Sequence, residues 1–283
     1  VRKTVRKTVW SSVWSPVWLA VGGAMILVAG AVNVEAQDDL RWSGRIEQGR
    51  TLEVRGISGN IRAVRASGTI AEVVAEKHGR SRDFEEVEIQ VLEDEYGVVV
   101  CVRYGSWNRG DGACDNDRGD HRGEGRRRRN IDVSVDFEVR VPSGVEFIGG
   151  MVTGDVEVTD VESDVTATSV SGDIYVSTTE VAWGSTVSGS IDIEMGSTDW
   201  DDLHFSTVSG DITLSLPADL DTEVEFESLS GDFEADFDVD IESRRRRMVG
   251  SRLRGVIGEG GRRLSFNTVS GDVTLRRTRG LVR

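Results

Sequence analysis

A short phrase built on Ser-Gly-Asp returns along the second half of the chain, and it constrains the fold more than any other feature. The copies read "TGDVEV" (153–158), "SVSGDIYVS" (169–177), "TVSGSIDIE" (186–194), "TVSGDITLS" (207–215), "SLSGDFEAD" (228–236) and "TVSGDVTLR" (268–276). Their glycines are separated by 18, 17, 21, 21 and 40 residues, which suggests that one copy inside the last interval has lost its signature. A weaker early copy, "GISGNIRAV" (56–64), indicates that the same arrangement begins near there.

Each copy predicts a strand, a corner and a second strand. In "STVSGDITLSL" the apolar residues Val208, Ile212 and Leu214 alternate with polar ones on both sides of the Ser-Gly pair, which is typical of half-buried strands. Glycine allows a backbone conformation that other residues avoid, and Ser and Asp side chains can bond backbone amides at a bend.

A repeat of about twenty residues cannot bury its apolar face alone, but stacked repeats bury a continuous core. We therefore predict an all-β chain folded as a right-handed parallel β-helix, or β-solenoid, with Ser-Gly-Asp corners. A sandwich of hairpins is the competing architecture, because strand-turn-strand units at short spacing also suit it.

Residues 1–36 predict an export signal. A basic start, Arg2, Lys3, Arg6 and Lys7, precedes an apolar run at 17–32 and the small residues of a cleavage site at 34–36. An uncleaved membrane anchor is the alternative, since the apolar stretch could reach about 20 residues. Both interpretations place the remaining chain outside the cytoplasm, in the periplasm or at the cell surface.

Charge and cysteine usage restrict the partners. The net charge of −15 makes binding to nucleic acid or an anionic membrane unfavourable, so membrane contact is expected only through residues 1–36, and only if they are not cleaved. The two cysteines, Cys101 and Cys114, would lie in an oxidising compartment, where a disulfide is the simplest expectation.

Residues 37–283 are predicted to form one β-solenoid domain with two departures from regularity. Residues 37–145 are less repetitive than the rest but still carry alternating or β-branched runs. A polar, Gly-rich segment at 106–130 predicts an irregular loop, and an insertion at 243–261 occupies the place of the missing copy.

The corners, the early "LEVRGISGNIRA" and the closing "GVIGEGGRRLSFNTVSGDVTL" resemble the bacterial putative-adhesin family of β-helical domains of unknown function. The resemblance covers most of residues 40–283 and implies an extracytoplasmic β-helical fold. That family has no established catalytic residues to carry over. The chain departs from the pattern at 188–190, where "SGS" replaces Ser-Gly-Asp, and in its Arg-rich segments.

Stacked corners would place their carboxylates in a column, with neighbours about 4.8 Å apart. Adjacent like charges at that distance repel by about 1 kcal/mol, which a bound Ca²⁺ could relieve. Alternatively, each carboxylate bonds the amides of its own turn, and Ser190, which interrupts the column, favours this alternative. The column comprises Asp155, Asp173, Asp211, Asp232 and Asp272.

Two arginine runs stand out in this acidic chain. Guanidinium groups suit phosphates, sulfates and carboxylates, so the runs could bind an anionic envelope polymer or the acidic face of a partner. Alternatively, they lie in exposed loops and pair with the protein's own carboxylates. The runs are Arg126, Arg127, Arg128, Arg129, Arg244, Arg245, Arg246 and Arg247.

No catalytic motif is recognisable, and His78, His121 and His204 lie in unrelated contexts. We therefore expect a noncatalytic, adhesin-like interaction module of the cell envelope whose partner is a glycan or a protein. No cofactor is expected, and calcium at the carboxylate column is the one candidate. An envelope-stress or signalling accessory that binds a membrane partner is one alternative. A polysaccharide-active β-helix enzyme is another.

Overall fold

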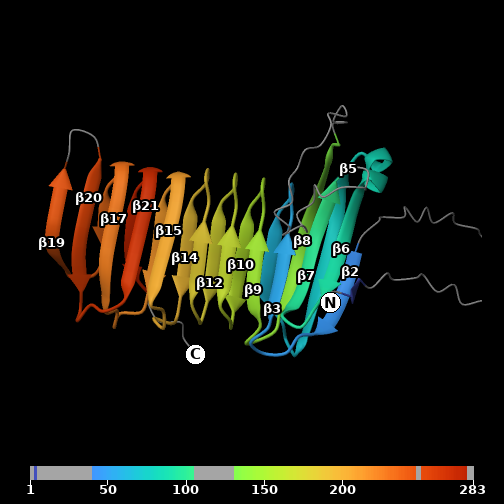
Figure 1. Ribbon diagram of the computed structural model, residues 1–283, viewed down its shortest axis with the longest axis horizontal. Coiled ribbons are helices and arrows are strands. Elements are labelled where there is room, and N and C mark those ends of the chain that lie inside the picture. Colours follow the sequence, from blue (N-terminus) through green and yellow to red (C-terminus); the bar gives the residue numbers. More distant parts are fainter. Residues whose placement is uncertain (1–2, 5–39, 105–130, 247–249, 279–283) are drawn as a thin grey trace, which may run out of the picture.

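Two large β-sheets lie face to face and form an elongated stack (Figure 1). The structure, a computed structural model, describes residues 3–4, 40–104, 131–246 and 250–278. The predicted all-β architecture with long parallel sheets is confirmed. No helix among the described residues is long and apolar enough to cross a membrane.

Sheet A has the strand order β1-β6-β7-β3-β9-β11-β13-β15-β21-β17-β20-β19. Its strands are β1 (Lys3–Thr4), β3 (Thr51–Arg55), β6 (Val87–Glu93), β7 (Gly97–Tyr104), β9 (Glu146–Gly150), β11 (Val165–Thr168), β13 (Ala182–Ser185), β15 (Asp202–Ser209), β17 (Thr222–Ser230), β19 (Val239–Arg246), β20 (Ser251–Ile257) and β21 (Arg263–Ser270).

Sheet B has the order β18-β22-β16-β14-β12-β10-β4-β8-β5-β2. Its strands are β2 (Leu40–Arg45), β4 (Ile61–Arg65), β5 (Ile70–Gly79), β8 (Val133–Val141), β10 (Val156–Val161), β12 (Ile174–Thr178), β14 (Ile191–Met195), β16 (Ile212–Leu216), β18 (Phe233–Ala235) and β22 (Val273–Arg277). A short 3₁₀ helix, η1 (Ser81–Glu86), lies between β5 and β6.

Each coil of the stack gives one strand to sheet A and the next strand to sheet B. Neighbouring coils pair in parallel and in register, so that Ile174 lies beside Ile191 and Ile191 beside Ile212. These side chains are almost completely buried between the sheets. Equivalent apolar residues therefore stack into continuous columns, and the alternation read from the sequence is what fills the core.

Antiparallel strands flank the parallel stack, in both sheets at one end and in sheet A alone at the other. At one end β6 pairs with β7, and β5 and β2 follow β8. At the other end β20 and β19 extend sheet A beyond β17. The predicted insertion at 243–261 therefore belongs largely to an ordered hairpin. These strands cover edges that an open parallel stack would leave unpaired.

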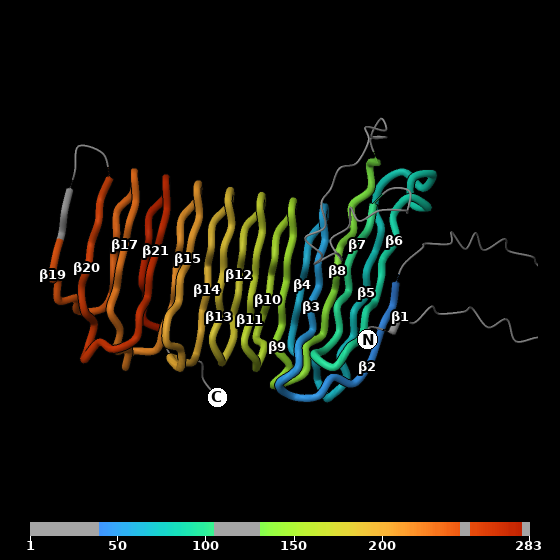
Figure 2. Tube along the Cα trace, in the orientation of Figure 1, coloured from blue at the N-terminus to red at the C-terminus, as the bar shows by residue number. Residues whose placement is uncertain are grey.

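The order of the coils in space differs from their order in the sequence. The coil made of β3 and β4 lies between β7–β8 and β9–β10, and the coil made of β21 and β22 lies between β15–β16 and β17–β18 (Figure 2). Gly271 accordingly stacks between Gly210 and Gly231. The interpretation that one copy had been lost within the 40-residue interval is therefore wrong: the last copy has moved inward along the stack.

The corner glycines form a column in which backbones approach too closely for any side chain. A Cβ atom added to Gly172 would lie 2.0 Å from the carbonyl oxygen of Gly154, and one added to Gly210 would lie 2.0 Å from that of Gly189. Gly210 also has a φ of +143°, whereas Gly172 has no positive φ. Close stacking is thus the requirement that all these corners share.

The residue before each corner serine points outward, which corrects the expectation for Val208. Val208 is 47% exposed, whereas the preceding Thr207 is only 3% exposed. The Thr207 hydroxyl donates a hydrogen bond of 3.2 Å to the Gly189 carbonyl of the neighbouring coil, as Ser169 and Thr186 do to the corner carbonyls beside them. The same outward position is occupied by Val152, Val170, Val187, Leu229 and Val269.

Candidate functional site

Several predicted site residues fall where the structure gives no test. Arg126–Arg129, Arg247 and Cys114 lie outside the described residues, as does nearly all of the predicted export signal. Cys101 is buried in β7. Arg244–Arg246 belong to β19, the outermost strand of sheet A. Anion binding by the arginine runs and the Cys101–Cys114 disulfide therefore stay predictions.

The corner carboxylates stack as expected, but four of the five accept a hydrogen bond from the adjacent coil. Asp155 Oδ1 accepts a hydrogen bond of 2.8 Å from the backbone N–H of Asp173, and Asp173 Oδ1 accepts one of 2.7 Å from that of Ser190. Further along, Asp211 Oδ1 accepts from the Asp272 amide at 2.9 Å, and Asp272 Oδ1 from the Asp232 amide at 2.8 Å. We call this series of bonds the corner ladder.

The corner ladder gives its carboxylates a role in holding the coils together. Within residues 40–104, 131–246 and 250–278, no group of three or more His, Cys, Asp or Glu side chains could hold a metal ion. A carboxylate that accepts an amide N–H keeps a good partner without one. Asn60 fills the same position in an earlier coil, where its side-chain oxygen accepts the Asp155 amide at 3.0 Å. A neutral acceptor therefore also works.

Replacing Asp173 tests the ladder. Asp173→Ala removes the acceptor of the exposed Ser190 amide and is expected to lower the free energy of unfolding by about 1 kcal/mol. Asp173→Asn keeps an acceptor oxygen, as Asn60 does, and should change stability by less than about 0.5 kcal/mol. Urea unfolding of the two variants measures the difference. Equal losses in both variants would show that the charge, rather than the hydrogen bond, matters.

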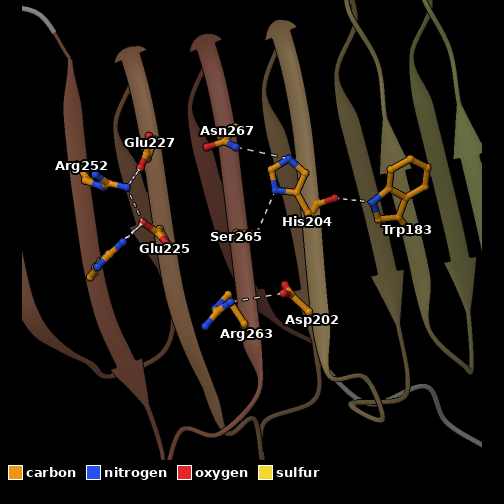
Figure 3. Close-up of a pocket in the computed structure, with 10 residues that line it drawn as sticks. Trp183, Asp202, His204, Glu225, Glu227, Arg252, Arg263, Ser265 and Asn267 are labelled. Carbon is orange, nitrogen blue, oxygen red and sulfur yellow. Dashed lines mark hydrogen bonds and ion pairs between the residues drawn. The ribbon is translucent and has the colours of Figure 1, made fainter.

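A shallow polar hollow lies elsewhere, on the outer face of sheet A (Figure 3). Its volume is about 550 Å³, and it spans strands β13, β15, β21, β17 and β20. We call it the sheet A groove. It is lined by Trp183, Asp202, His204, Glu225, Glu227, Arg252, Arg254, Arg263, Ser265 and Asn267.

Strand pairing places the groove residues in rows across the sheet. His204 lies beside Ser265, Ser265 beside Glu225, and Glu225 beside Arg254. Trp183 extends this central row, because its indole N–H donates to the His204 carbonyl. The alternate residues on the same strands, including Phe205, Leu264 and Phe226, are buried in the core and fix the strands.

The floor of the groove is an ordered hydrogen-bond network centred on Ser265. The Ser265 hydroxyl donates to the Leu203 carbonyl at 3.1 Å, so it accepts from His204 Nδ1, which lies 3.0 Å away. We therefore assign the Nδ1–H tautomer to neutral His204. Its Nε2 is then an acceptor, and the Asn267 amide nitrogen lies 3.5 Å from it (Figure 3).

Ion pairs on β17 and β20 form one end of the groove. Glu225 accepts from Arg252 at 2.9 Å and from Arg254 at 2.6 Å, and Arg252 also pairs with Glu227. The hydrogen bond from Arg254, joined by that from Arg252, lowers the pKa of Glu225 below its usual range. Across the sheet, Arg263 lies 3.6 Å from Asp202. The charges of the lining thus neutralise one another locally.

None of the groove residues was predicted as a site from sequence, although His204 had been noted. A signal was present, because Trp183, His204, Glu225 and Ser265 each stand six positions before a corner glycine: Gly189, Gly210, Gly231 and Gly271. Aligning the copies on their glycines puts these four side chains at one structural position. Their order across the sheet still requires knowing that β21 lies between β15 and β17.

Comparison with known proteins gives a family but no named activity. No curated protein sequence matches the chain. A solved structure from Clostridium sporogenes, described as a putative cell adhesion protein, is similar with 9% identity and a TM-score of 0.39, over 85% of this chain and 100% of the other. A putative adhesin from Bacteroides fragilis is similar with 10% identity and a TM-score of 0.33, over 85% of this chain and 97% of the other.

The family model described as Toastrack DUF4097 matches residues 153–276, which include every residue that lines the sheet A groove. That segment also carries the six corner copies that begin at "TGDVEV". Residues 153–276 therefore belong to the Toastrack domain family, and the predicted resemblance to the bacterial putative-adhesin domains of unknown function is confirmed.

Proposed function

We propose that the protein is a noncatalytic, adhesin-like interaction module of the cell envelope and that it binds its partner through the sheet A groove. The observation that carries this proposal is the groove itself. It combines an indole, an imidazole, an amide and a hydroxyl on adjacent strands of a rigid sheet. Polar groups that converge in a hollow next to an aromatic side chain are typical of binding sites.

The electrostatics of the groove support binding rather than catalysis. A catalytic acid or base needs a carboxylate or imidazole whose pKa is tuned toward the working pH. Here the pKa of Glu225 moves the other way, because two guanidinium groups hold it in its charged form. Among the described residues of the groove, the carboxylates of Asp202, Glu225 and Glu227 each have an arginine partner.

The placement of this module outside the cytoplasm is supported by the sequence of residues 1–36, with its basic start and apolar run. A long, rigid stack that presents one continuous polar face also suits contact with a large partner. The proposal therefore gives the parallel coils a structural role and the outer face of sheet A the recognition role.

Binding to separated envelope fractions tests the proposal. The full chain, with its cysteines oxidised, is immobilised and exposed separately to cell-wall polymer, outer-surface polysaccharide and membrane fractions of the source cell. We expect one fraction to be retained. The double variant Trp183→Ala with Asn267→Ala should weaken retention by at least about tenfold, which corresponds to about 1.4 kcal/mol.

The matched control is Tyr175→Ala, which removes a 43% exposed aromatic side chain from sheet B, the opposite side of the same stack. It should bind like the native chain. Retention of no fraction, or full retention by the groove double variant, would overturn the proposal. Thermal unfolding of each variant confirms that the comparison is made between folded proteins.

A further inference from the structure

If the proposed function holds, the side chains of the sheet A groove restrict the class of ligand that it can bind. We infer that the groove binds an uncharged, hydroxyl-rich glycan whose chain runs across the strands, along the long axis of the stack. The inference depends on the direction of the rows, on the hydrogen-bonding groups that face the hollow, and on the pairing of its charges.

The direction of the bound glycan is inferred from the register of the strands. The central row runs from Trp183 on β13 through His204 and Ser265 to Glu225 and Arg254 on β20. Neighbouring strands lie about 4.8 Å apart, so five strands give a row about 19 Å long. The row is straight and crosses the sheet, which fits an extended chain with several contacts better than one compact small molecule.

The hydrogen-bonding groups suit hydroxyls. His204 Nε2 has one lone pair, which faces the Asn267 amide nitrogen at 3.5 Å, so Asn267 keeps its second N–H and its side-chain oxygen for a ligand. A sugar hydroxyl can accept from that N–H or donate to that oxygen. Ser265, already engaged with Leu203 and His204, supplies a low floor rather than a protruding contact.

Trp183 provides the apolar surface that a sugar ring needs. Its indole N–H is already bonded to the His204 carbonyl, so the ring is held at one end of the row (Figure 3). A half-buried indole fixed at its polar edge offers a flat apolar face at little cost in conformational entropy. The C–H face of a pyranose ring is complementary to such a surface.

The charge balance argues against an ionic polymer. The lining contains Asp202, Glu225 and Glu227 together with Arg252, Arg254 and Arg263, and these groups pair with one another. A polyanion would have to displace carboxylates from their arginines and approach a chain of net charge −15. A polycation would have to displace the arginines. An uncharged ligand leaves every pair intact.

A peptide strand is also less suited to this surface. Each of β13, β15, β21, β17 and β20 has a hydrogen-bonded neighbour on both sides, so no strand edge is open for backbone pairing. The hollow also lacks the deep apolar pocket that usually anchors a protein partner. Side-chain recognition of a glycan remains the best match.

The test starts from the envelope fraction that the full chain retains, and it treats that fraction in three ways. Periodate cleaves vicinal diols and should abolish binding, whereas protease digestion should leave binding unchanged. Raising the salt from about 0.1 M to about 1 M screens ionic contacts and should change the affinity less than about twofold. Oligosaccharides released from the fraction by partial hydrolysis should compete better as they lengthen, until they span the row.

Substitutions test whether this binding takes place in the groove. Trp183→Ala should weaken binding of the longest uncharged oligosaccharide by at least about tenfold, and Trp183→Phe should recover most of that loss. Tyr175→Ala on sheet B should change nothing. Filling the floor with Ser265→Arg should abolish binding while the protein stays folded by circular dichroism and thermal unfolding.

Each contrary result has its own meaning. Loss of binding after protease digestion would assign the groove to a protein partner, and elution by salt would assign it to a charged polymer. Either outcome overturns the glycan inference and leaves the interaction module standing. Retention of no fraction at all overturns the proposed function itself, so the two failures can be told apart.

Discussion

Gly210→Ala is expected to lower the free energy of unfolding by about 3–5 kcal/mol, the combined cost of a strained φ and of overpacking. The new methyl group would lie 2.0 Å from the Gly189 carbonyl oxygen, and the backbone at Gly210 has a φ of +143°. Neither coil can move away without breaking the register of its neighbours. Urea and thermal unfolding of the full chain measure the loss.

Alanine substitutions at three further glycines distinguish the effect of a strained φ from that of steric overlap. Gly172 has no positive φ but would bring a methyl group 2.0 Å from the Gly154 carbonyl oxygen, whereas Gly49 has a φ of +78° and open space around it. Gly68 has neither restriction. Alanine should therefore cost several kcal/mol at Gly172, about 1 kcal/mol at Gly49 and almost nothing at Gly68. A large loss at Gly49 with a small one at Gly172 would contradict this account of the corners.

Phe266→Ala is expected to cost about 3–5 kcal/mol, the usual range for removing a fully buried aromatic ring. Phe266 is 0% exposed, and its ring stacks on Phe205 with centroids 5.7 Å apart. It also lies 6.4 Å from the ring of Phe233, which comes from sheet B. One substitution therefore removes contacts with the coils on both sides of β21–β22.

The control for this prediction is Phe266→Leu, which keeps most of the apolar volume and should cost less than about 2 kcal/mol. Both variants are compared by urea denaturation at one pH. A loss below about 1 kcal/mol in Phe266→Ala would mean that the inserted coil contributes little to the stability of its neighbours. Groove binding should weaken with Phe266→Ala only as far as the folded fraction falls.

The sequence alone was sufficient for the kind of fold and for the stacking of its corners. Alternation around Ile212 and Leu214 identified core strands correctly, and the repeated glycines located the corners. Val208 was assigned to the wrong face because simple alternation ignores the backbone turn at the corner. There, Thr207 takes the inward position, and its hydroxyl donates to the Gly189 carbonyl of the neighbouring coil.

Contacts between coils could not be predicted from the sequence, because they depend on the order of the coils in space. In the corner ladder the amide partner of a carboxylate is 17 or more residues away, as with Asp173 and Ser190, and a single copy contains no sign of it. Trp183 and Arg254 line one groove because β21, which follows the other groove strands in the sequence, lies between β15 and β17. Regular spacing suggested a regular order, and the structure departs from that order at both ends.

The inward position of β21–β22 restricts the order in which the coils can assemble. A chain is synthesised from its N-terminus, so β15–β16 and β17–β18 exist before the coil that separates them. The bonds that join Asp272 to Asp211 and to Asp232 span 61 and 40 residues, and such distant contacts form late. A growing chain that stops before residue 263 therefore presents unpaired apolar edges, which favour aggregation. The stack seen here is therefore joined only once β21 and β22 have been made.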